Sequence, residues 1–469
     1  MKLFNTLSRT IEDFEPLNAP KVTFYSCGPT VYDFTHIGHL RTFVNNDILK
    51  RVLIYAGYQV THVMNITDVG HLTGDDDTGE DKLEKGAKLQ KKTVWEIAEF
   101  YTRQFNKSLT EINISPADIL CKATDHITDM INLIQRLQNK GVTYETDQAI
   151  YFDITKSANY GRLSGQKLSE KNIGSRDEVY ADPDKKNSAD FALWFKRLGR
   201  FKNHTMHWDS PWGPGFPGWH IECSAMSMKY LGDTIDIHSG GIDHIAVHHE
   251  NEIAQSETAT GKLFVLLWFH NAFLLVDGEK MSKSKKNFYT LDDLKKKDYD
   301  PLALRYLYLL THYQKPLNFT WEAITAAQNA LFSLRNLVLT LKQGVNRHNL
   351  YPEKLKKTLD YQKRFDEALF ENLQLPQALA VIFEALKSNI PSSDKLDLVY
   401  NLDQITGLAL YHVEPDVIPQ QVTKLAEKRE LARRQGDFDM ADDLRAEIEK
   451  LGYMIEDVKS GFVLKKIKT

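Results

Sequence analysis

Sulfur, imidazole and carboxylate groups stand at positions from which they could bind one metal ion. Cys27 ends a predicted strand, and Cys223 lies in the string GWHIECSAM. The string HHENE opens a predicted helix with His248, and Glu252 follows four residues later on the same helix face. Two thiolates, an imidazole and a carboxylate match the ligand chemistry of Zn²⁺, although single cysteines are more often core residues. Spacing alone leaves two further candidate ligands open: His249 and Glu250.

Two other strings carry groups that could handle phosphate. In PTVYDFTHIGH, where the first predicted strand gives way to a helix, His36 and His39 share one face at the helix N-terminus. Donors placed there can hold phosphate oxygens, and Gly38 leaves room for a nucleotide. The string GEKMSKSKK carries Lys280 and Lys283, whose ammonium groups could stabilise a charged transition state. Taken singly, each string is equally consistent with a surface turn or a solvated run of charges.

Taken together, HIGH and KMSKS resemble the paired signatures of class I aminoacyl-tRNA synthetases, in the same order along the chain. The resemblance implies that both motifs bind ATP, a substrate taken with Mg²⁺. The amino-acid carboxylate would then attack the α-phosphate, giving an aminoacyl-adenylate and pyrophosphate. The residues that would stabilise the triphosphate, with Gly38 beside the nucleotide, are His36, His39, Lys280 and Lys283.

Cys27, GWHIEC and HHENE resemble the cysteinyl-tRNA synthetases. The resemblance implies one zinc ion per chain that binds the substrate thiolate, with protein ligands Cys27, Cys223, His248 and Glu252. Such a metal would reject serine, because steric pockets separate near-isosteres poorly whereas a thiolate binds zinc far better than a hydroxyl. The resemblance also places five residues around the amino acid, with the aspartate on its ammonium group: Gly28, Thr67, Trp219, His238 and Asp243.

Three features depart from that family or have no role in it. His244 stands where the family usually has an apolar residue, and it adds an imidazole near the predicted site. The acidic loop 69–86 replaces the usual run after Asp68. Its aspartates invite a calcium interpretation, but Gly79 occupies the place of a third oxygen ligand, so a solvated loop is predicted. Cys121 has no matching role and is expected to be a core thiol.

The elements that must position these groups follow an α/β pattern. Strand signals over 22–27 and 60–66 flank a helical stretch over 40–56, which is a βαβ unit of a parallel sheet. A second set of such signals follows Gly218, and the pattern becomes purely helical beyond Pro316. The predicted fold is a Rossmann-like class I synthetase catalytic domain with an insertion, followed by an α-helical bundle and a small mixed C-terminal domain.

The chain is predicted to divide into five parts. In order these are the catalytic domain (1–106 and 201–270), a connective insertion (107–200), the KMSKS loop and stem-contact region (271–315), a helical bundle (316–411) and a C-terminal anticodon-binding domain (412–469).

The C-terminal part carries a basic cluster on consecutive turns of one predicted helix: Lys424, Lys428, Arg429, Arg433 and Arg434. Such a cluster could contact phosphates, or it could be a solvated face paired with Glu427 and Glu430. The resemblance favours recognition of the anticodon of tRNA(Cys).

The bulk composition excludes little. The chain has 469 residues, is 42% hydrophobic and 26% charged, and has a net charge of −4, so no global charge indicates nucleic acid. Three cysteines exclude a disulfide framework and fit a reducing cytosol. The longest apolar runs are shorter than a membrane span. A cytoplasmic monomer is expected. Two alternatives share these motifs: a ligase that joins cysteine to an amino sugar in mycothiol synthesis, and a non-catalytic RNA-binding paralogue.

Overall fold

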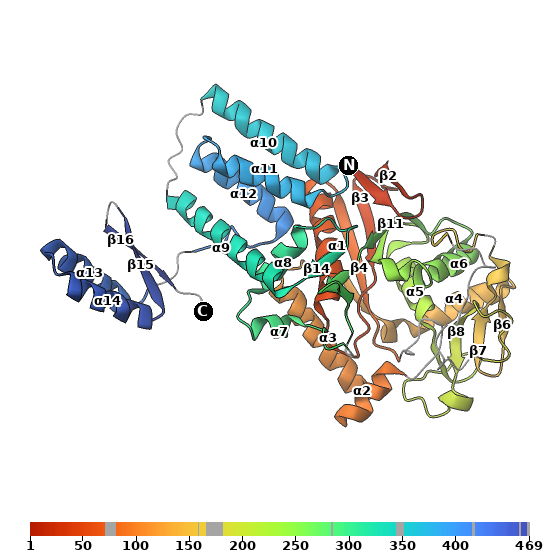
Figure 1. Cartoon of the computed structure of the whole chain (residues 1–469). Coiled ribbons are helices and arrows are strands. Elements are labelled where there is room, and N and C mark those ends of the chain that lie inside the picture. The colour runs from red at the N-terminus through yellow and green to blue at the C-terminus, as the bar shows by residue number, and fades with distance from the viewer. Residues whose placement is uncertain are drawn as a thin grey trace.

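A five-stranded parallel sheet forms the centre of the structure (Figure 1). The computed structural model describes residues 1–70, 81–157, 159–165, 182–282, 285–343, 351–414, 418–458 and 461–466. In spatial order the strands are β11 (Val265–Asn271), β10 (Ile235–Gly241), β3 (Lys21–Ser26), β4 (Gln59–Ile66) and β5 (Ile119–Lys122). The chain runs outward from β3 in one direction and from β10 in the other, so the strand order reverses between these two neighbours. Open α/β sheets bind ligands at the carboxyl ends of the strands at such a point.

Helices cover both faces of this sheet. Neighbouring strand residues point to opposite faces, and Phe24 and Tyr25 of β3 belong to two separate cores. Phe24 lies in the core that contains α1 (Ile37–Tyr55), and Tyr25 lies in the core that contains α5 (Trp219–Leu231). α6 (His248–Thr260) packs against α5. The HIGH string and the metal-ligand strings therefore begin helices on opposite faces of one sheet edge.

α1 is buried on most of its surface because it contacts β4, β10 and three later elements: β12 (Leu274–Val276), α8 (Pro301–Leu309) and α12 (Ser392–Thr406). Its Arg41 is 1% exposed and donates hydrogen bonds to the backbone carbonyls of Ala272, Phe273, His312 and Lys315. A buried guanidinium needs such partners. Arg41 thus fixes the helix of the HIGH string to the chain that carries the KMSKS string.

The predicted insertion needs one correction. The range 107–200 was assigned wholly to an insertion, but β5 lies inside it and pairs in parallel with β4. β5 has only four residues, too few for a periodic pattern, and α3 (Val94–Glu111) runs across the expected boundary. After α4 (Ile127–Asn139), a separate antiparallel sheet is formed by β6 (Thr143–Glu145), β7 (Ala149–Phe152), β8 (Phe191–Lys196) and β9 (Gly215–Pro217).

Smaller elements complete the α/β half. They are the hairpin β1 (Lys2–Asn5) and β2 (Thr10–Asp13), the helices α2 (Lys82–Gln90) and α7 (Leu291–Lys295), and the strands β13 (Glu279–Lys280) and β14 (Leu317–Phe319), which flank β12 in a second small sheet.

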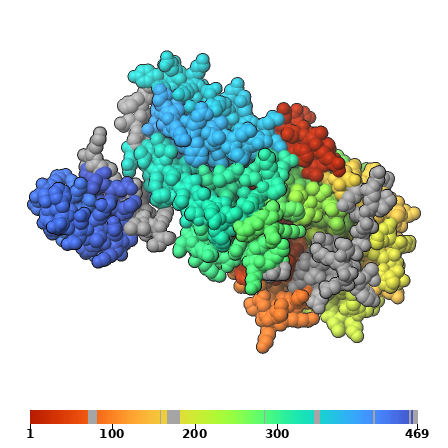
Figure 2. Space-filling model, in the orientation of Figure 1, coloured from red at the N-terminus to blue at the C-terminus, as the bar shows by residue number. Residues whose placement is uncertain are grey.

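A helical bundle and a C-terminal unit follow. The bundle helices are α9 (Trp321–Gln343), α10 (Pro352–Phe370), α11 (Leu375–Lys387) and α12. The C-terminal unit contains α13 (Gln420–Gln435), α14 (Phe438–Lys450) and the hairpin β15 (Tyr453–Val458) and β16 (Gly461–Lys466), and it has its own small core. It stands apart from the rest of the molecule in Figures 1 and 2. Among the described residues, no helix is long and apolar enough to cross a membrane.

Candidate active site

A cavity of about 520 Å³ opens where β3 and β10 end. Cys27 and Gly28 follow β3, and Asp243 lies in the short turn Ile242–His244 after β10. This is the position that the reversal of strand order predicts for a ligand site. Nine of the predicted site residues line the cavity: Cys27, Gly28, His36, His39, Thr67, Trp219, Cys223, Asp243 and His248.

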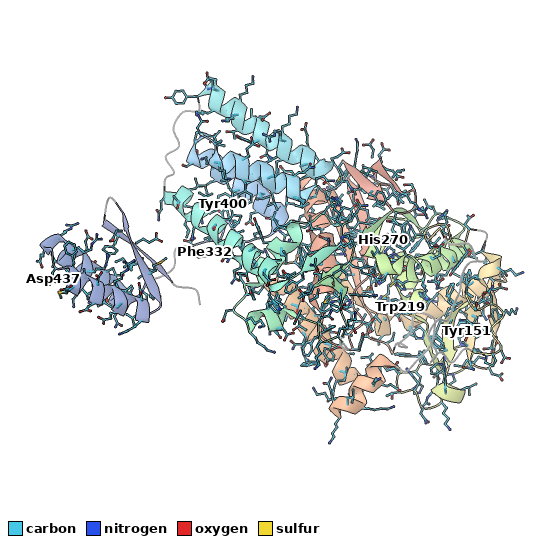
Figure 3. All side chains as sticks on the ribbon, in the orientation of Figure 1. Tyr151, Trp219, His270, Phe332, Tyr400 and Asp437 are labelled. Atoms are coloured by element: carbon cyan, nitrogen blue, oxygen red, sulfur yellow. The ribbon has the colours of Figure 1, made fainter. Side chains whose placement is uncertain are left out.

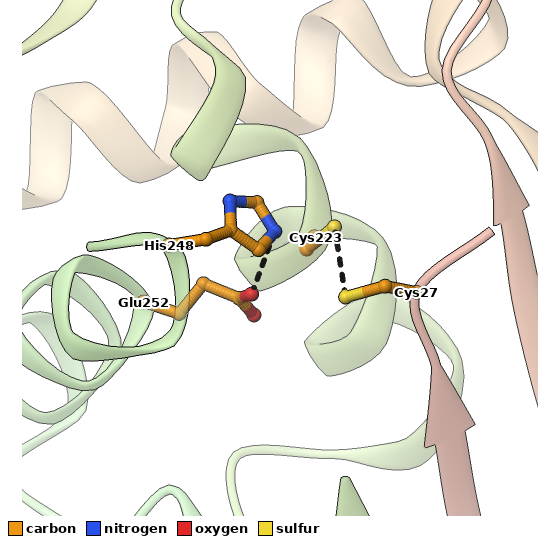
Figure 4. A group of neighbouring side chains, drawn as sticks. All are labelled: Cys27, Cys223, His248 and Glu252. Atoms are coloured by element: carbon orange, nitrogen blue, oxygen red, sulfur yellow. Dashed lines mark hydrogen bonds and ion pairs between the residues drawn. The ribbon is translucent and has the colours of Figure 1, made fainter. Parts of the chain in front are cut away.

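Four of the predicted ligands meet in one buried group. Cys27 comes from the loop after β3, Cys223 from α5, and His248 and Glu252 from the first turns of α6, and their side chains point toward one another (Figure 4). Their ligand atoms all lie within 4.8 Å of one another, and the two sulfurs are 4.0 Å apart. Tetrahedral thiolates at ordinary Zn–S distances stand roughly 3.8 Å apart. The group could therefore hold a metal ion with little rearrangement.

Two unsatisfied atoms in this group support a metal there. His248 Nε2 and Glu252 Oε1 are buried and make no hydrogen bond within the described part of the chain. They lie 3.0 Å apart at ion-pair distance, but their alignment is not that of a hydrogen bond. Leaving buried polar atoms unpaired costs about 1–3 kcal/mol each. A cation bound between them would satisfy both.

The electrostatics of the group also favour a cation. Burial opposes a charge on His248, but Glu252 and Cys223 outweigh it and raise the pKa of the imidazole to about 10. Burial likewise opposes the charge on Glu252, but His238 and His248 lower the pKa of that carboxyl to about 2. Without a metal, the imidazolium ion supplies the positive charge that the carboxylate requires. Metal binding then exchanges a proton for the ion, as is general for such sites.

The structure separates His248 from the two neighbours that spacing left open. His249 Nε2 lies 3.4 Å from Cys27 Sγ, and its Nδ1 lies 2.8 Å from His270 Nε2, so both ring nitrogens have partners. Glu250 accepts three backbone N–H bonds, from Gly161, Leu163 and Ser164. Glu250 therefore holds the insertion against α6 and takes no part in the group.

A second set of atoms could also hold a metal: Cys27, His238, His249 and Glu252. His238 and His249 are 0% exposed and do not line the cavity. An ion bound there would be closed to a substrate, whereas Cys27, Cys223 and His248 face the cavity. The first set is therefore the one suited to binding a ligand.

His238 lies behind the metal group and does not reach the cavity. Its Nε2 is 2.9 Å from Glu252 Oε2, and its ring stacks on Trp268 with centroids 4.7 Å apart. Trp219, at the start of α5, stacks on His248 from the cavity side with centroids 4.1 Å apart. Figure 3 labels Trp219 and His270 in this part of the α/β half. The aromatic neighbours hold the imidazoles of the group in place from two sides.

A chain of hydrogen bonds forms the wall opposite α6. Gly28 N–H donates to Asn65 Oδ1 (2.8 Å), Asn65 Nδ2 donates to Thr67 Oγ1 (3.1 Å), and Thr67 Oγ1 donates to Glu222 Oε2 (2.9 Å). A Cβ on Gly28 would stand 1.6 Å from the carbonyl oxygen of Asn65, so only glycine fits. The sequence analysis gave Asn65 and Glu222 no role. Their places inside the strings NITD and GWHIEC were the available signal.

The HIGH string forms the N-terminal cap of α1. His36 Nδ1 accepts the backbone N–H groups of Gly38 and His39, both at 3.1 Å. Burial and the neighbouring His39 lower the pKa of His36 to about 2, so the ring is neutral and its proton is on Nε2. The two imidazoles stack with centroids 3.6 Å apart. The pair therefore offers an N–H donor at a helix N-terminus, which is a site for anions.

The chain after KMSKS closes over this turn. Ile37 N–H donates to Tyr289 O (2.9 Å), and Phe288 packs edge-on against His36. A Cβ on Gly38 would stand 2.5 Å from the terminal methyl of Met281, so Gly38 leaves room for the KMSKS methionine. The two ATP strings are therefore in direct contact.

Two predicted residues do not line the cavity, and a third cannot be placed. Gly38 lies beside it, under Met281. Lys280 is exposed in β13, with its ammonium 5.3 Å from the ring centroid of Phe273. Lys283 lies outside the described residues, as do residues 71–80 of the acidic loop. Cys121 is a buried thiol of β5, as predicted, and all three cysteines are unpaired.

Comparison with known proteins identifies the fold and the family. The model of the class I (C) tRNA synthetase catalytic domain matches residues 13–329, and that of the cysteinyl-tRNA ligase anticodon binding domain matches residues 416–462. Among solved structures, a methionyl-tRNA synthetase of Mycobacterium tuberculosis is similar with a TM-score of 0.57 at 17% identity, covering 90% of this chain and 96% of its own. The LeuRS of Agrobacterium radiobacter K84 has a TM-score of 0.60 at 13% identity, covering 86% of this chain and 85% of its own. These likenesses confirm the predicted fold class.

Curated relatives cover the whole chain. A cysteine–tRNA ligase of Treponema denticola is 43% identical over 100% of both chains. The cysteine–tRNA ligase 1 of Burkholderia lata is 44% identical over 98% of this chain and 96% of its own. Identity of this level over the full length, with both domain models matched in order, shows that the chain belongs to the cysteine–tRNA ligase family of class I aminoacyl-tRNA synthetases.

Proposed function

We propose that the chain activates L-cysteine with ATP to cysteinyl-adenylate and pyrophosphate, then transfers the cysteinyl group to the 3′ end of tRNA(Cys) with release of AMP. One observation carries this proposal: a single cavity is lined both by metal-ligand side chains and by the His36–His39 pair. Its volume of about 520 Å³ suits a nucleotide with a small amino acid. Amino-acid selection and ATP binding can therefore occur side by side.

We propose that the metal is one Zn²⁺ per chain, held by Cys27, Cys223, His248 and Glu252. When bound, the ion takes the substrate thiolate as a further ligand, which the hydroxyl of serine replaces poorly. The protein orients the ligands before substrate arrives. His238 holds Glu252 from behind, and His249 contacts Cys27 from the far side.

At the other part of the cavity, the neutral His36 donates from Nε2 to a phosphate oxygen of ATP. His39 stacks on it and adds a second imidazole at the N-terminus of α1, whose dipole favours anions. Lys280 and Lys283 add positive charge from the KMSKS segment, and Mg²⁺ accompanies ATP as part of the substrate. Met281 on Gly38 couples the position of that segment to α1.

The amino acid is held between these two parts. Asp243 is exposed in the turn after β10 and pairs with the ammonium group. Gly28 lets the backbone of the opposite wall approach, Thr67 is fixed by Asn65, and Trp219 covers the side chain beside His248. His238 acts indirectly, through Glu252.

The C-terminal unit is proposed to recognise the anticodon of tRNA(Cys). Lys424, Lys428 and Arg434 are exposed on α13. Arg429 is 3% exposed and forms a bidentate ion pair with Asp457, to which Arg433 also binds. Three of the five basic residues are therefore presented to a partner, and two hold α13 on the hairpin. We also propose a monomer that acts in the cytoplasm, which agrees with three unpaired cysteines.

The reaction can be tested in two stages. Cysteine-dependent exchange of pyrophosphate into ATP is expected, with serine at least about 100-fold less effective. Transfer of labelled cysteine to tRNA, and none to an amino sugar, is expected next. Exchange without transfer to tRNA would contradict the ligase assignment, and absence of exchange would favour a non-catalytic RNA-binding protein.

Gly28→Ala is expected to lower kcat/KM for cysteine-dependent exchange by about 100-fold, since the added Cβ forces the wall beside the substrate out of position. Steady-state exchange kinetics measure this loss. Gly86→Ala is the matched control, because a Cβ there would meet its nearest atoms at 3.8 Å. Equal activity of both variants would show that the Gly28 wall does not position the substrate.

Replacing Lys424, Lys428 and Arg434 together by alanine is expected to raise KM for tRNA about 10-fold, because phosphate contacts are lost. Cysteine-dependent exchange should be unchanged, since the C-terminal unit is remote from the cavity (Figure 1). The control removes the same charge from α10 through Lys356, Lys357 and Lys363. An unchanged KM for tRNA, or the same rise in the control, would refute a specific role for α13.

A further inference from the structure

One imidazole of the cavity wall has no role in the function proposed above. His244 closes the short turn Ile242–His244 after β10 and lines the cavity together with Trp219, Asp243 and His248. The family usually has an apolar residue at this position, so the imidazole is a feature of this chain. It adds a polar group to a wall that otherwise serves binding.

The ring of His244 is directed at the metal group. Its centroid lies 5.1 Å from that of His248, 5.0 Å from that of His249 and 5.9 Å from that of Trp219. It meets all three rings nearly edge-on or steeply inclined. His244 therefore fills the angle between the two histidines of α6 and the tryptophan that covers them.

One nitrogen of this ring lacks a partner. Nδ1 is buried and makes no hydrogen bond to any residue that the structure describes. It lies at the face of Gly240, where an added Cβ would stand 2.6 Å from His244 Nδ1 and 2.9 Å from His249 Nε2. His249 Nε2 is in turn 3.4 Å from Cys27 Sγ. The glycine thus keeps open a small space between His244 Nδ1 and the sulfur side of the metal group.

We infer that His244 Nδ1–H donates a hydrogen bond to the sulfur of the bound amino acid, and so contributes to the selection of cysteine. This inference rests on the proposed function, because it requires the substrate sulfur to lie beside Cys27, Cys223 and His248. A buried donor without a partner costs free energy, and a thiolate in that space would satisfy it with a charge-assisted bond. His244 is a positioning residue for the sulfur and not a metal ligand.

The geometry allows a test that resolves the two ring nitrogens. An asparagine amide can occupy the place of Nδ1, whereas the longer glutamine places its amide near Nε2. By titration calorimetry, His244→Leu is expected to weaken cysteine binding about 10-fold, His244→Asn to stay within about threefold of the unchanged protein, and His244→Gln to resemble leucine. Metal content should remain one ion per chain in all variants. Loss of the ion from His244→Leu would show a ligand instead and overturn the inference.

Substrate fragments identify the atom that His244 contacts. Cysteamine lacks the carboxylate and 3-mercaptopropionate lacks the amine, so His244→Leu should weaken both by the same factor as cysteine. An effect on only one of them would assign the bond to the amine or the carboxylate and overturn the sulfur assignment. In the Co²⁺-substituted protein, the sulfur-to-metal charge-transfer band produced by cysteine should shift in His244→Leu and return in His244→Asn. An unshifted band would also overturn it, and failure of the unchanged protein to bind cysteine would refute the proposed function itself.

Discussion

Replacing Cys223 by serine is expected to abolish stoichiometric metal binding and to lower kcat/KM for cysteine activation by more than about 100-fold. Changing groups that merely orient a metal ligand typically costs 10–100-fold, and this change removes one of two thiolates. Cys223 is 1% exposed, and its sulfur is 4.0 Å from that of Cys27, so no other thiol can take its place. Elemental analysis and exchange kinetics on the same preparation measure both effects.

The third cysteine provides the control. Cys121 is buried in β5, outside the cavity, where its thiol donates only a weak bond to Met64 O at 3.6 Å. A serine can make the same bond, so Cys121→Ser should keep the metal and the activity. Full metal content and activity in Cys223→Ser would mean that the second set of atoms, with His238 and His249, binds the ion. Equal losses in both variants would indicate a general effect of cysteine removal on folding.

The ligand types and two of the helix positions could be predicted from sequence because they depend on local geometry. His248 and Glu252 share a face of α6 by their i, i+4 spacing, and the structure brings their ligand atoms to 3.0 Å. The choice between His248 and its neighbours depends on distant partners. His249 meets His270, and Glu250 meets a loop some ninety residues earlier, so no local spacing could reveal either contact.

Misplaced residues show the same limit. His238 alternates on β10 with residues that face the cavity, but the helix behind it takes its imidazole onto Glu252. Gly38 was expected to leave space for the nucleotide, and the space is filled by Met281 from a string more than two hundred residues later. The parallel sheet was predictable from the βαβ pattern, whereas β5 was not, since four residues carry too little periodicity.

Asp47→Asn is expected to destabilise the protein by about 3–5 kcal/mol, because it leaves a fully buried guanidinium without its counter-charge. Asp47 Oδ2 lies 2.5 Å from Arg305 Nη2 and 2.8 Å from Arg51 Nε, and both Asp47 and Arg305 are 0% exposed at the side chain. Arg305 also donates to the carbonyls of Ile112, Asn113 and Thr406. The change therefore loosens α1 from α8 and α12 together, and urea unfolding followed by circular dichroism measures the loss.

The pH dependence gives this prediction a second readout. Burial raises the pKa of Asp47, but Arg305 and Arg51 outweigh it and hold the pKa below the ordinary value. A carboxyl with a depressed pKa in the folded state contributes stability above its unfolded pKa of about 3.9, and the contribution is lost as the pH falls through the folded value. The difference between the unchanged protein and Asp47→Asn should therefore be constant near neutrality and shrink in acid. Replacing the pair by apolar residues, Asp47→Leu with Arg305→Met, should recover most of the stability, since neither charge is then buried. If the double variant is as unstable as Asp47→Asn, the carbonyl bonds of Arg305 and not its charge pairing hold α1 in place.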